Sequence, residues 1–569
     1  MSHSLPAPHP PSQSMSPRGL LTTVVVVGVV IRTWVISRGW FYWDDFILTA
    51  EVRSQPLSEL LLSSHDGHLM PGSWLLLWAI DALSGGAYSW PVAVAVLAAL
   101  TAAAAAAFGY AAWTIAPRHA WWITGLYLIN PLLLPTSTWL AAAVNSLPLQ
   151  ALAAVWLAHG WRFQRRRRVV DLVVIVVAVV AACLFSERAL LLAPVSAVIV
   201  LLWVGPGRRG GWAPVVIAFI APVVAWLAIY LSTVGDPVEV TQRSASLGAI
   251  VTSGYFNGFA ATLVGGPWGW SRWHPGPPFA AASVLGAALG GAAVVALAAW
   301  AYAKRSLAPV AVALAYPLLP LAALYWVRSG QGTAVEIALT LRHFSEVLVL
   351  VGLTVAAAMR RSGHRAAGRL PAFTGPAVAL AVAGSSLVSV VTYTLVWQDQ
   401  PARSYFATLT SQQAQQEVTL LDQQLPPEIL TPVAEPYHWL SWHIDGVSDY
   451  THTPTVIDAA GAIVPAELMP MRATALEPGC VAPRVTRVLT LDGPLVERDW
   501  VLRLNVLAEA VDQVTVALET SEEPVVVDVQ PGMQQVHVRL VGGGNTVLVG
   551  AENTPLCLGR SEVGQLLPR

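Results

Sequence analysis

Two adjacent aspartates, Asp44 and Asp45, are the strongest candidates for catalytic residues in this sequence. They lie in "FYWDDF", between four aromatic residues and an apolar run. A carboxylate can act as a general base or bind a divalent cation. Neighbours on a helix point in different directions, so only one of the two can face a given cleft. We predict one general base here, while the other caps the short helix that begins at this point, pairs with Arg38 or Arg53, or holds a metal ion. A capping role alone is the simpler alternative.

A second polar cluster follows about twenty residues later in "SSHDGHLMP", which contains His65, Asp66, His68 and Pro71. Histidines can donate hydrogen bonds to phosphate, or bind a metal together with a carboxylate. The alternative is that these histidines only happen to lie at a membrane interface. The sequence leaves open whether Mg²⁺ or Mn²⁺ is needed, and it offers Asp45 and Asp66 as ligands.

Two further charged clusters interrupt apolar runs: Glu187 and Arg188 in "LFSERALLLAP", and Arg342 and His343 in "LTLRHFSEVLVL". Charges at membrane depth normally face a cavity or one another. A guanidinium group can grip a phosphate with two hydrogen bonds, which suits Arg342 to a lipid phosphate. The alternatives are a simple turn at the first cluster and an ordinary interfacial anchor at the second. The candidates for binding a donor phosphate or an acceptor are therefore His65, Asp66, His68, Glu187, Arg188, Arg342 and His343.

The composition places these residues in a membrane protein. Of the 569 residues, 55% are hydrophobic and only 11% are charged, against about a quarter charged in soluble domains. Many apolar runs approach the roughly 20 residues with which a helix crosses a bilayer. The net charge of −1 gives no support to a nucleic-acid partner. The absence of GxxxxGK[ST], GxGxxG, HExxH and CxxC motifs speaks against an ATP-driven pump.

We expect a polytopic α-helical membrane protein with about eleven to thirteen crossings. Residues 1–18, rich in Pro and Ser, are predicted to be a disordered cytoplasmic tail. No signal-peptide cleavage site follows the first apolar run, so we expect it to stay as an anchor. The predicted spans are 19–37, 69–84, 90–114, 120–134, 138–160, 169–185, 188–204, 213–233, 279–302, 307–327, 344–359 and 372–396, with 247–265 as an interrupted further candidate.

Basic clusters at 162–168, 207–211, 304–305 and 360–369 predict the cytoplasmic side. They place residues 38–68 and everything after about 397 outside. The predicted spans do not agree with this, because five of them before residue 162 put "RFQRRRR" outside. Either one short span is re-entrant or incomplete, or the basic cluster departs from the rule. Among the spans, 120–134, with Asn130 and Pro131, is the weakest.

After the last span the composition changes from apolar to polar. Residues 397–479 are predicted to be a mixed external linker region. Residues 480–569 alternate apolar and polar residues in short runs separated by turn residues, which predicts an all-β domain of the sandwich type. Cys480 and Cys557 lie at the two ends of this domain, and a disulfide between them fits an external, oxidising compartment. Two free thiols in a reducing compartment are the alternative.

Together these features resemble a known group of enzymes. An uncleaved first span, "YWDDF" in the first external loop, "HDGHLMP" before the next apolar segment, a dozen helices and an external β-domain are similar to the GT-C superfamily of polyprenyl-phosphate-sugar-dependent glycosyltransferases. The nearest members in style are the Rgt-like and arabinofuranosyltransferase-like proteins of bacteria, and the Ala, Val and Arg bias is of actinobacterial style. The resemblance covers about residues 19–396. Many members carry an Asp after the fourth span, where this chain has Asn145.

The resemblance implies a function. The acidic residue of the first loop is the catalytic base in that superfamily, which falls on Asp44 or Asp45 here. The donor would be a polyprenyl-phosphate sugar, and the acceptor a cell-envelope glycan, lipid or protein at the outer face of the plasma membrane. Arg342, with Arg188 or His68, would stabilise the departing phosphate.

Two other classes of function stay open at this point. A transporter or flippase for lipid-linked glycans should carry ionisable residues at mid-membrane depth, whereas most charges here lie at span ends, apart from Arg32, Asp81 and Glu187. A non-catalytic scaffold would use its β-domain to bind a cell-wall glycan.

Overall fold

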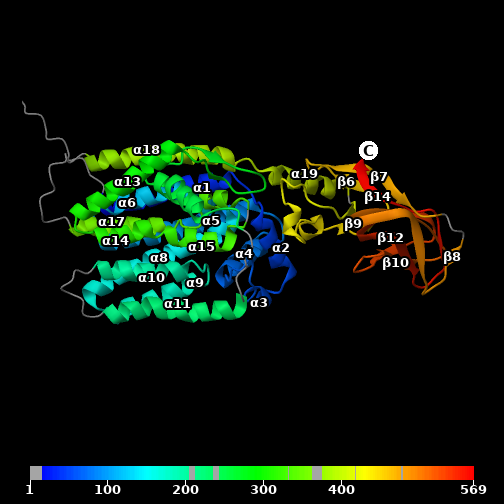
Figure 1. Cartoon of the computed structure of the whole chain (residues 1–569), viewed down its shortest axis with the longest axis horizontal. Coiled ribbons are helices and arrows are strands. Elements are labelled where there is room, and N and C mark those ends of the chain that lie inside the picture. Colours follow the sequence, from blue (N-terminus) through cyan, green and yellow to red (C-terminus); the bar gives the residue numbers. More distant parts are fainter. Residues whose placement is uncertain are drawn as a thin grey trace, which may run out of the picture. The chain divides into compact units, whose positions relative to one another are not determined.

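The structure is a computed structural model that describes residues 16–203, 212–234, 243–330, 332–361, 374–416, 418–475 and 479–569. Most of the predicted N-terminal tail lies outside these residues. The chain divides into two compact units, Met1–Asp399 and Gln400–Arg569 (Figure 1). The first is helical and the second is built mainly of strands.

The helical unit has the helices of a multi-pass membrane protein, as the composition predicts. Seven helical stretches in the described residues are long and apolar enough to cross a bilayer, and four shorter helices are also apolar. The long ones include α1 (Pro17–Ser37), α5 (Trp90–Ile115), α8 (Leu140–Arg166), α11 (Trp212–Val234), α13 (Val284–Ala303), α14 (Leu307–Ala315) with α15 (Leu318–Arg328), and α18 (Thr374–Trp397); the shorter ones are α6 (Ala120–Ile129), α9 (Val169–Cys183), α10 (Ala189–Leu202) and α17 (Val347–Arg361).

The break after α6 is supported by a buried arginine. The helix stops at Asn130 because Pro131 follows, and the chain continues through η1 (Pro131–Leu133) and α7 (Leu134–Thr138). From α1, Arg32 donates to the carbonyl oxygens of Leu128 at 2.8 Å and Asn130 at 2.6 Å. These are carbonyls that the break leaves without helical partners. The one charge inside the predicted first span therefore stabilises a neighbouring helix end.

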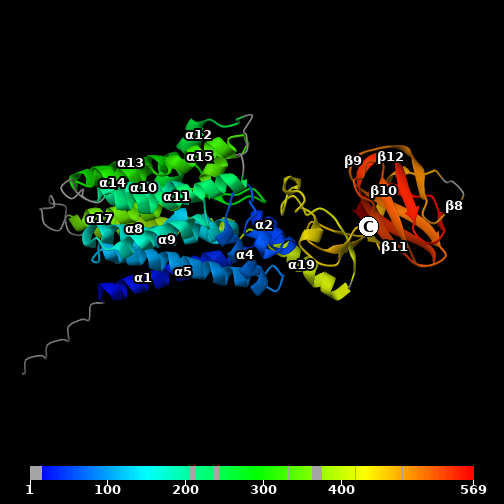
Figure 2. The same ribbon diagram turned by 90° about the horizontal axis from the view of Figure 1, so that it is seen from below.

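The predicted span 69–84 does not cross the bundle. It forms α4 (Pro71–Leu83), whose 13 residues extend only about 20 Å. Near its start, Ser73 hydrogen-bonds to Asn145 in the first turns of α8. At its end, Asp81 pairs at 2.9 Å with Arg53 of α2 (Asp44–Ser54). Figures 1 and 2 show α2, α3 (Leu57–Leu60) and α4 together at one end of the helices.

This placement removes the conflict in the predicted topology, and it shows that 69–84, not 120–134, is the incomplete span. Without it, the basic segment 162–168 lies at the same end of the bundle as the start of α1. Three contacts mark that end: Arg18 lies over the ring of Trp113, Arg162 donates to the hydroxyl of Tyr110, and Arg360 donates to the carbonyl of Ile115. The arrangement agrees with retention of basic residues on the cytoplasmic side.

Shorter elements complete the helical unit between α11 and α17. They are α12 (Leu247–Val251), η3 (Thr252–Ala260), β1 (Trp270–Ser271), β2 (Phe279–Ala280) and α16 (Ala334–Leu339). The predicted candidate 247–265 therefore appears as a short α-helix followed by a π-helix. Its far end contacts the α6 break, where the Asn130 amide donates to the carbonyl of Thr262 at 3.0 Å.

The C-terminal unit confirms the predicted all-β domain. Ten of its strands form one sheet that curls into a half-barrel, with β9 (Thr486–Ala508) and β12 (Gly532–Ala551) paired antiparallel along most of their length. Alternate side chains such as Leu502, Leu504 and Val538 form its buried core. The other strands of the sheet are β5 (Tyr450–Thr451), β6 (Thr455–Ile457), β7 (Ile463–Ala473), β8 (Cys480–Val481), β10 (Asp512–Leu518), β11 (Val525–Val529), β13 (Leu556–Leu558) and β14 (Glu562–Pro568).

The two cysteines of this unit are joined. Cys480 in β8 and Cys557 in β13 lie opposite each other in paired strands and form a disulfide bond. Cys183 in α9 is a buried free thiol. The region predicted to be a linker contributes β5, β6 and β7 to the same sheet, and it also contains α19 (Pro401–Gln416), β3 (Leu420–Leu421) and β4 (Val447–Ser448).

The position of α4 can be tested by labelling single introduced cysteines. Leu62→Cys and Leu83→Cys flank α4 at exposed positions, and Val169→Cys is exposed at the opposite end of the bundle. We expect a membrane-impermeant maleimide added to intact cells to label the first two and to spare the third until the membrane is opened. Labelling of Leu62→Cys and Leu83→Cys from opposite sides would show that α4 crosses the membrane. The parent chain, whose only free thiol in the described residues is buried, gives the background.

Candidate functional site

The two adjacent aspartates have different surroundings. Asp45 is fully buried: its Oδ1 accepts from the N–H of Ala141 at 2.9 Å and its Oδ2 from the N–H of Tyr42 at 3.2 Å. It thereby ties the first turn of α2 to the first turn of α8. Burial raises the pKa of Asp45 well above its usual value, against the effect of these two hydrogen bonds. Both carboxylate oxygens of Asp45 are therefore occupied by backbone N–H groups, whereas the side chain of Asp44 stays partly exposed.

Asp44 lies next to Arg342, which comes from the other half of the sequence. Its Oδ2 is 3.9 Å from the Nη1 of Arg342, and about a quarter of each side chain is exposed. Burial raises the pKa of Asp44, while the charge of Arg342 works against that rise. The carboxylate that can reach substrate thus lies beside a cation that can hold an anion.

Stacked aromatic rings pack against the Arg342 side of this pair. The guanidinium carbon of Arg342 lies 4.0 Å from the ring centre of Trp139, a cation–π contact. Trp139 stacks on Tyr42 with ring centres 5.0 Å apart, and Arg272 lies 4.8 Å over the other ring. Two arginines therefore flank one Tyr–Trp pair. Sequence reasoning missed Trp139, because a single tryptophan in an apolar run carries no signal of its own.

Three of the four aromatic residues before the aspartates lie in the protein interior. Trp40, Phe41 and Tyr42 are all buried and pack inside the protein on residues including Tyr88, Trp90, Trp139 and Trp397. The neighbouring arginines also have other partners than those predicted. Arg53 pairs with Asp81, and Arg38 lies over Trp34.

The histidine cluster forms a tight turn that directs the side chains of His65, Asp66 and His68 toward partners of opposite charge. The backbones of His65 and His68 exchange hydrogen bonds of 3.1 and 2.8 Å, while Asp66 and Gly67 between them have φ of 49° and 78°. An Asp-Gly pair favours this two-residue turn, so the dipeptide could have predicted it. The turn directs His65 to Glu51 at 2.9 Å, His68 to Glu187 at 2.5 Å and Asp66 to Arg328 at 3.4 Å.

The charge state of this turn follows from its partners. Glu187 raises the pKa of His68 more than burial lowers it. Burial alone would raise the pKa of Glu187, but His68 outweighs it and the pKa falls to about 2. Burial also works to lower the pKa of His65, yet Glu51 raises it above its usual value. Burial would raise the pKa of Asp66, but His65 and Arg328 bring it below its usual value.

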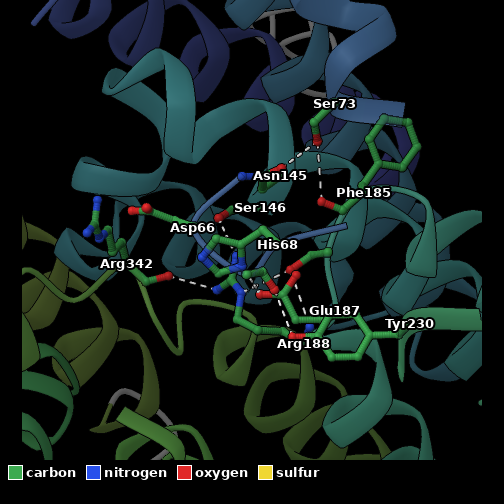
Figure 3. Close-up of polar contacts among 12 residues, drawn as sticks. Asp66, His68, Ser73, Asn145, Ser146, Phe185, Glu187, Arg188, Tyr230 and Arg342 are labelled. Atoms are coloured by element: carbon green, nitrogen blue, oxygen red, sulfur yellow. Dashed lines mark hydrogen bonds and ion pairs between the residues drawn. The ribbon is translucent and has the colours of Figure 1, made fainter. Parts of the chain in front are cut away.

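Arg188 holds the loop that carries Arg342. Its Nη1 donates to the carbonyl oxygen of Arg342 at 2.7 Å and to Oε2 of Glu346 at 2.8 Å, and its Nη2 donates to Oγ of Ser146 at 2.6 Å (Figure 3). Glu346 is fully buried and also accepts from the hydroxyl of Tyr316 at 2.7 Å. Both terminal nitrogens of Arg188 therefore bind protein groups, and one of them fixes the backbone at Arg342.

His343 follows Arg342 and presents a ring nitrogen to it. The Nε of Arg342 lies 3.4 Å from the Nε2 of His343. Burial lowers the pKa of His343 well below its usual value, and the charges of Arg342 and Arg188 act in the same direction. The imidazole is thus neutral and helps to orient the guanidinium.

The side chains at this site do not fit a bound divalent metal. In the part of the chain that the structure describes, no three His, Cys, Asp or Glu residues are grouped to hold an ion. Of the two predicted ligands, Asp45 uses both oxygens on backbone N–H groups and Asp66 pairs with Arg328. The protein side chains are therefore the groups available for chemistry at this site.

Replacement of the two aspartates should separate stability from chemistry. Asp45→Asn exchanges one accepting oxygen of a buried carboxylate for an amide N–H, which cannot accept the bond that it replaces. We expect a loss of roughly 2 kcal/mol in unfolding free energy. Asp44→Asn should leave the free energy of unfolding nearly unchanged, because the side chain is partly exposed. Thermal unfolding of the two purified variants measures the difference, and equal losses would contradict these roles.

The pair of His68 and Glu187 should make stability depend on pH. Because the folded-state pKa of His68 is raised, its contribution is complete below about pH 6.5 and is lost as the pH rises through the folded pKa. Because that of Glu187 is depressed, its contribution is present above about pH 4.5 and is lost toward pH 2. We expect the melting temperature of the parent to fall between pH 6 and 9 by more than that of His68→Gln. Parallel pH profiles would contradict the ion pair.

Comparison with known proteins gives only distant structural matches. No family model and no curated protein matches the sequence. Among solved structures, the chain is similar to arabinofuranosyltransferase AftD from mycobacteria, with 12% identity and a TM-score of 0.37, over 98% of this chain and 60% of that one. A point mutant of the same enzyme gives 13% identity and a TM-score of 0.38, over 98% and 62%. This chain thus spans about 60% of the length of the structures it matches, and the assignment of the site depends on its own geometry.

Proposed function

We propose that this protein is a glycosyltransferase of the plasma membrane that moves a sugar from a polyprenyl-phosphate donor to a cell-envelope glycan, lipid or protein acceptor. The observation that carries the proposal is the approach of Asp44 to Arg342. A candidate base and a candidate anion ligand lie together at the end of the helical bundle opposite its basic segments. By the positive-inside rule, this end faces the outside.

The lipid-linked donor fits the position of the site. A polyprenyl chain would lie among the apolar helices, and its phosphate would reach the helix ends, where Arg342 is held. A guanidinium group can make two parallel hydrogen bonds to phosphate oxygens. Arg342 lies in a short loop between α16 and α17, and Arg188 fixes the backbone of that loop at the residue itself. Such pre-organised cations stabilise charge that develops in a transition state.

The transfer step follows from these two groups. Asp44 takes the proton of an acceptor hydroxyl while the hydroxyl oxygen forms a bond to the anomeric carbon of the donor sugar. The bond between that carbon and the phosphate oxygen breaks, and the leaving lipid phosphate keeps the electron pair beside Arg342. The C-terminal unit, with its disulfide bond, would lie on the same outer side.

Conservative replacements of the two groups test the proposal. We expect Asp44→Asn to lower the rate of sugar transfer by roughly 10²- to 10⁴-fold, the usual contribution of a general base. Arg342→Lys keeps the charge but loses the planar fork, so it should chiefly weaken the use of the lipid-phosphate donor. The assay is transfer of labelled sugar from polyprenyl-phosphate donors by the purified full chain in lipid nanodiscs.

Matched variants control for charge and position. Glu59→Gln removes an exposed carboxylate from the same external region, and Arg38→Lys changes another arginine that lies over a tryptophan. Both should transfer sugar at the parent rate. Parent-like transfer by Asp44→Asn would overturn the assignment of the base.

A further inference from the structure

A cavity of about 240 Å³ lies within the C-terminal unit, and none of the residues of the candidate site lines it. It opens where the segment before the large sheet meets the long strand β12, which supplies Arg539. The other side chains that matter are Asp422, Trp439, Ser441, Trp442 and Asp449. Sequence reasoning passed over this region, where "EPYHWLSWHIDGVSDY" resembles no known motif.

The polar groups of the cavity are held in fixed positions. The Nη1 of Arg539 lies 2.8 Å from Oδ1 of Asp449 and 3.5 Å from Oδ2 of Asp422. Asp422 also accepts from the N–H of Ser441 at 3.0 Å and from its hydroxyl at 2.9 Å. The guanidinium carbon of Arg539 lies 3.6 Å over the ring of Trp439. Each charged group is therefore oriented before any ligand arrives.

The charge of the cavity excludes two kinds of ligand. Two carboxylates surround one guanidinium group, so the local charge is negative and a phosphate or a carboxylate would be repelled. Arg539 already pairs with both carboxylates, so a metal ion could bind them only by displacing the arginine from an existing ion pair. A neutral ligand that both donates and accepts hydrogen bonds fits best, since hydroxyl groups can bridge an acid and an arginine.

An aromatic surface completes the cavity. Trp442 is half-buried and is held edge-on by Tyr437, with ring centres 5.1 Å apart. A fixed indole ring offers an apolar face at low entropic cost. The carbon-bound hydrogens on one face of a sugar ring can pack there while its hydroxyls reach the charged groups.

We propose that this cavity binds a neutral saccharide unit of a glycan, which stacks on Trp442 and hydrogen-bonds to Asp422, Asp449 and Arg539. The site goes beyond the proposed transfer reaction, because it needs neither Asp44 nor Arg342. Within the proposed function it would hold the acceptor, and it would bind the same saccharide if no transfer took place.

Equilibrium binding to the full chain in lipid nanodiscs tests this inference. The probes are neutral tetrasaccharides built of pentofuranose, hexofuranose or hexopyranose units. Saturation-transfer NMR measures their binding. We expect at least one class to bind the parent, and Trp442→Ala to raise its Kd by roughly tenfold or more. Asp449→Asn, which changes a half-exposed side chain, should weaken binding by a smaller factor and guards against a folding defect in the tryptophan variant.

Two controls separate this site from the transfer site. Asp44→Asn should bind the saccharide with the parent Kd while losing transfer, and Met533→Ala removes an exposed side chain of the same unit without effect. Unchanged binding by both Trp442→Ala and Asp449→Asn would overturn the inference. So would the lack of binding by any probe, or tighter binding of a sugar phosphate than of its neutral parent sugar.

Discussion

The buried carboxylate of Asp45 is the joint on which the candidate site depends. One side chain accepts hydrogen bonds from the start of α2 and the start of α8, two segments about a hundred residues apart. Because both bonds are enclosed by protein and shielded from water, they fix the direction in which α2 leaves α1. Asp44 precedes Asp45 as the first residue of α2 and must then point elsewhere, toward Arg342. The two adjacent acids thus have different positions: Asp45 fixes the start of α2, and this leaves the carboxylate of Asp44 directed toward Arg342.

Arg188 plays a similar part for the loop that carries Arg342. Arg188 connects the loop after α9, the first turns of α8 and the loop before α17 through Ser146, Glu346 and the carbonyl of Arg342. A lysine could not make these bonds together, because the planar fork of arginine sets their directions. The α8 start is shared by both joints, so Asp44 and Arg342 are positioned from one common helix. This explains how residues from distant parts of the chain come within 4 Å.

The sequence predicted the broad architecture because its causes are local. Apolar runs and alternating runs identify helices and strands by their periods, and basic clusters identify one side of the membrane. The position of α4 was beyond this reasoning, since an apolar helix of 13 residues that packs on protein has the same composition as a short span. The burial of Trp40 to Tyr42 was missed for a similar reason, because an aromatic residue suits a lipid interface and a protein core equally.

The hydrogen-bond and ion-pair partners of the candidate residues were harder to predict than the candidate residues themselves. The clusters proposed from the sequence lie near one another, yet the side chains of Arg188 and Asp45 are engaged by other protein groups. The unpredicted members, Trp139, Ser146, Glu51 and Arg328, have no distinguishing neighbours in the chain. Their roles exist only because the fold brings them to charged groups, and a single sequence does not record those distances.

The arrangement also links the two groups of the proposed reaction. Burial raises the pKa of Asp44, and Arg342 limits that rise while its charge is available. If a donor phosphate occupies Arg342, its negative charge cancels the cation and itself acts on the carboxylate, so the pKa of Asp44 must rise further. A more basic carboxylate takes a proton from a hydroxyl more readily. Under the proposed mechanism, donor binding would therefore activate the base through electrostatics alone, without any movement of the helices.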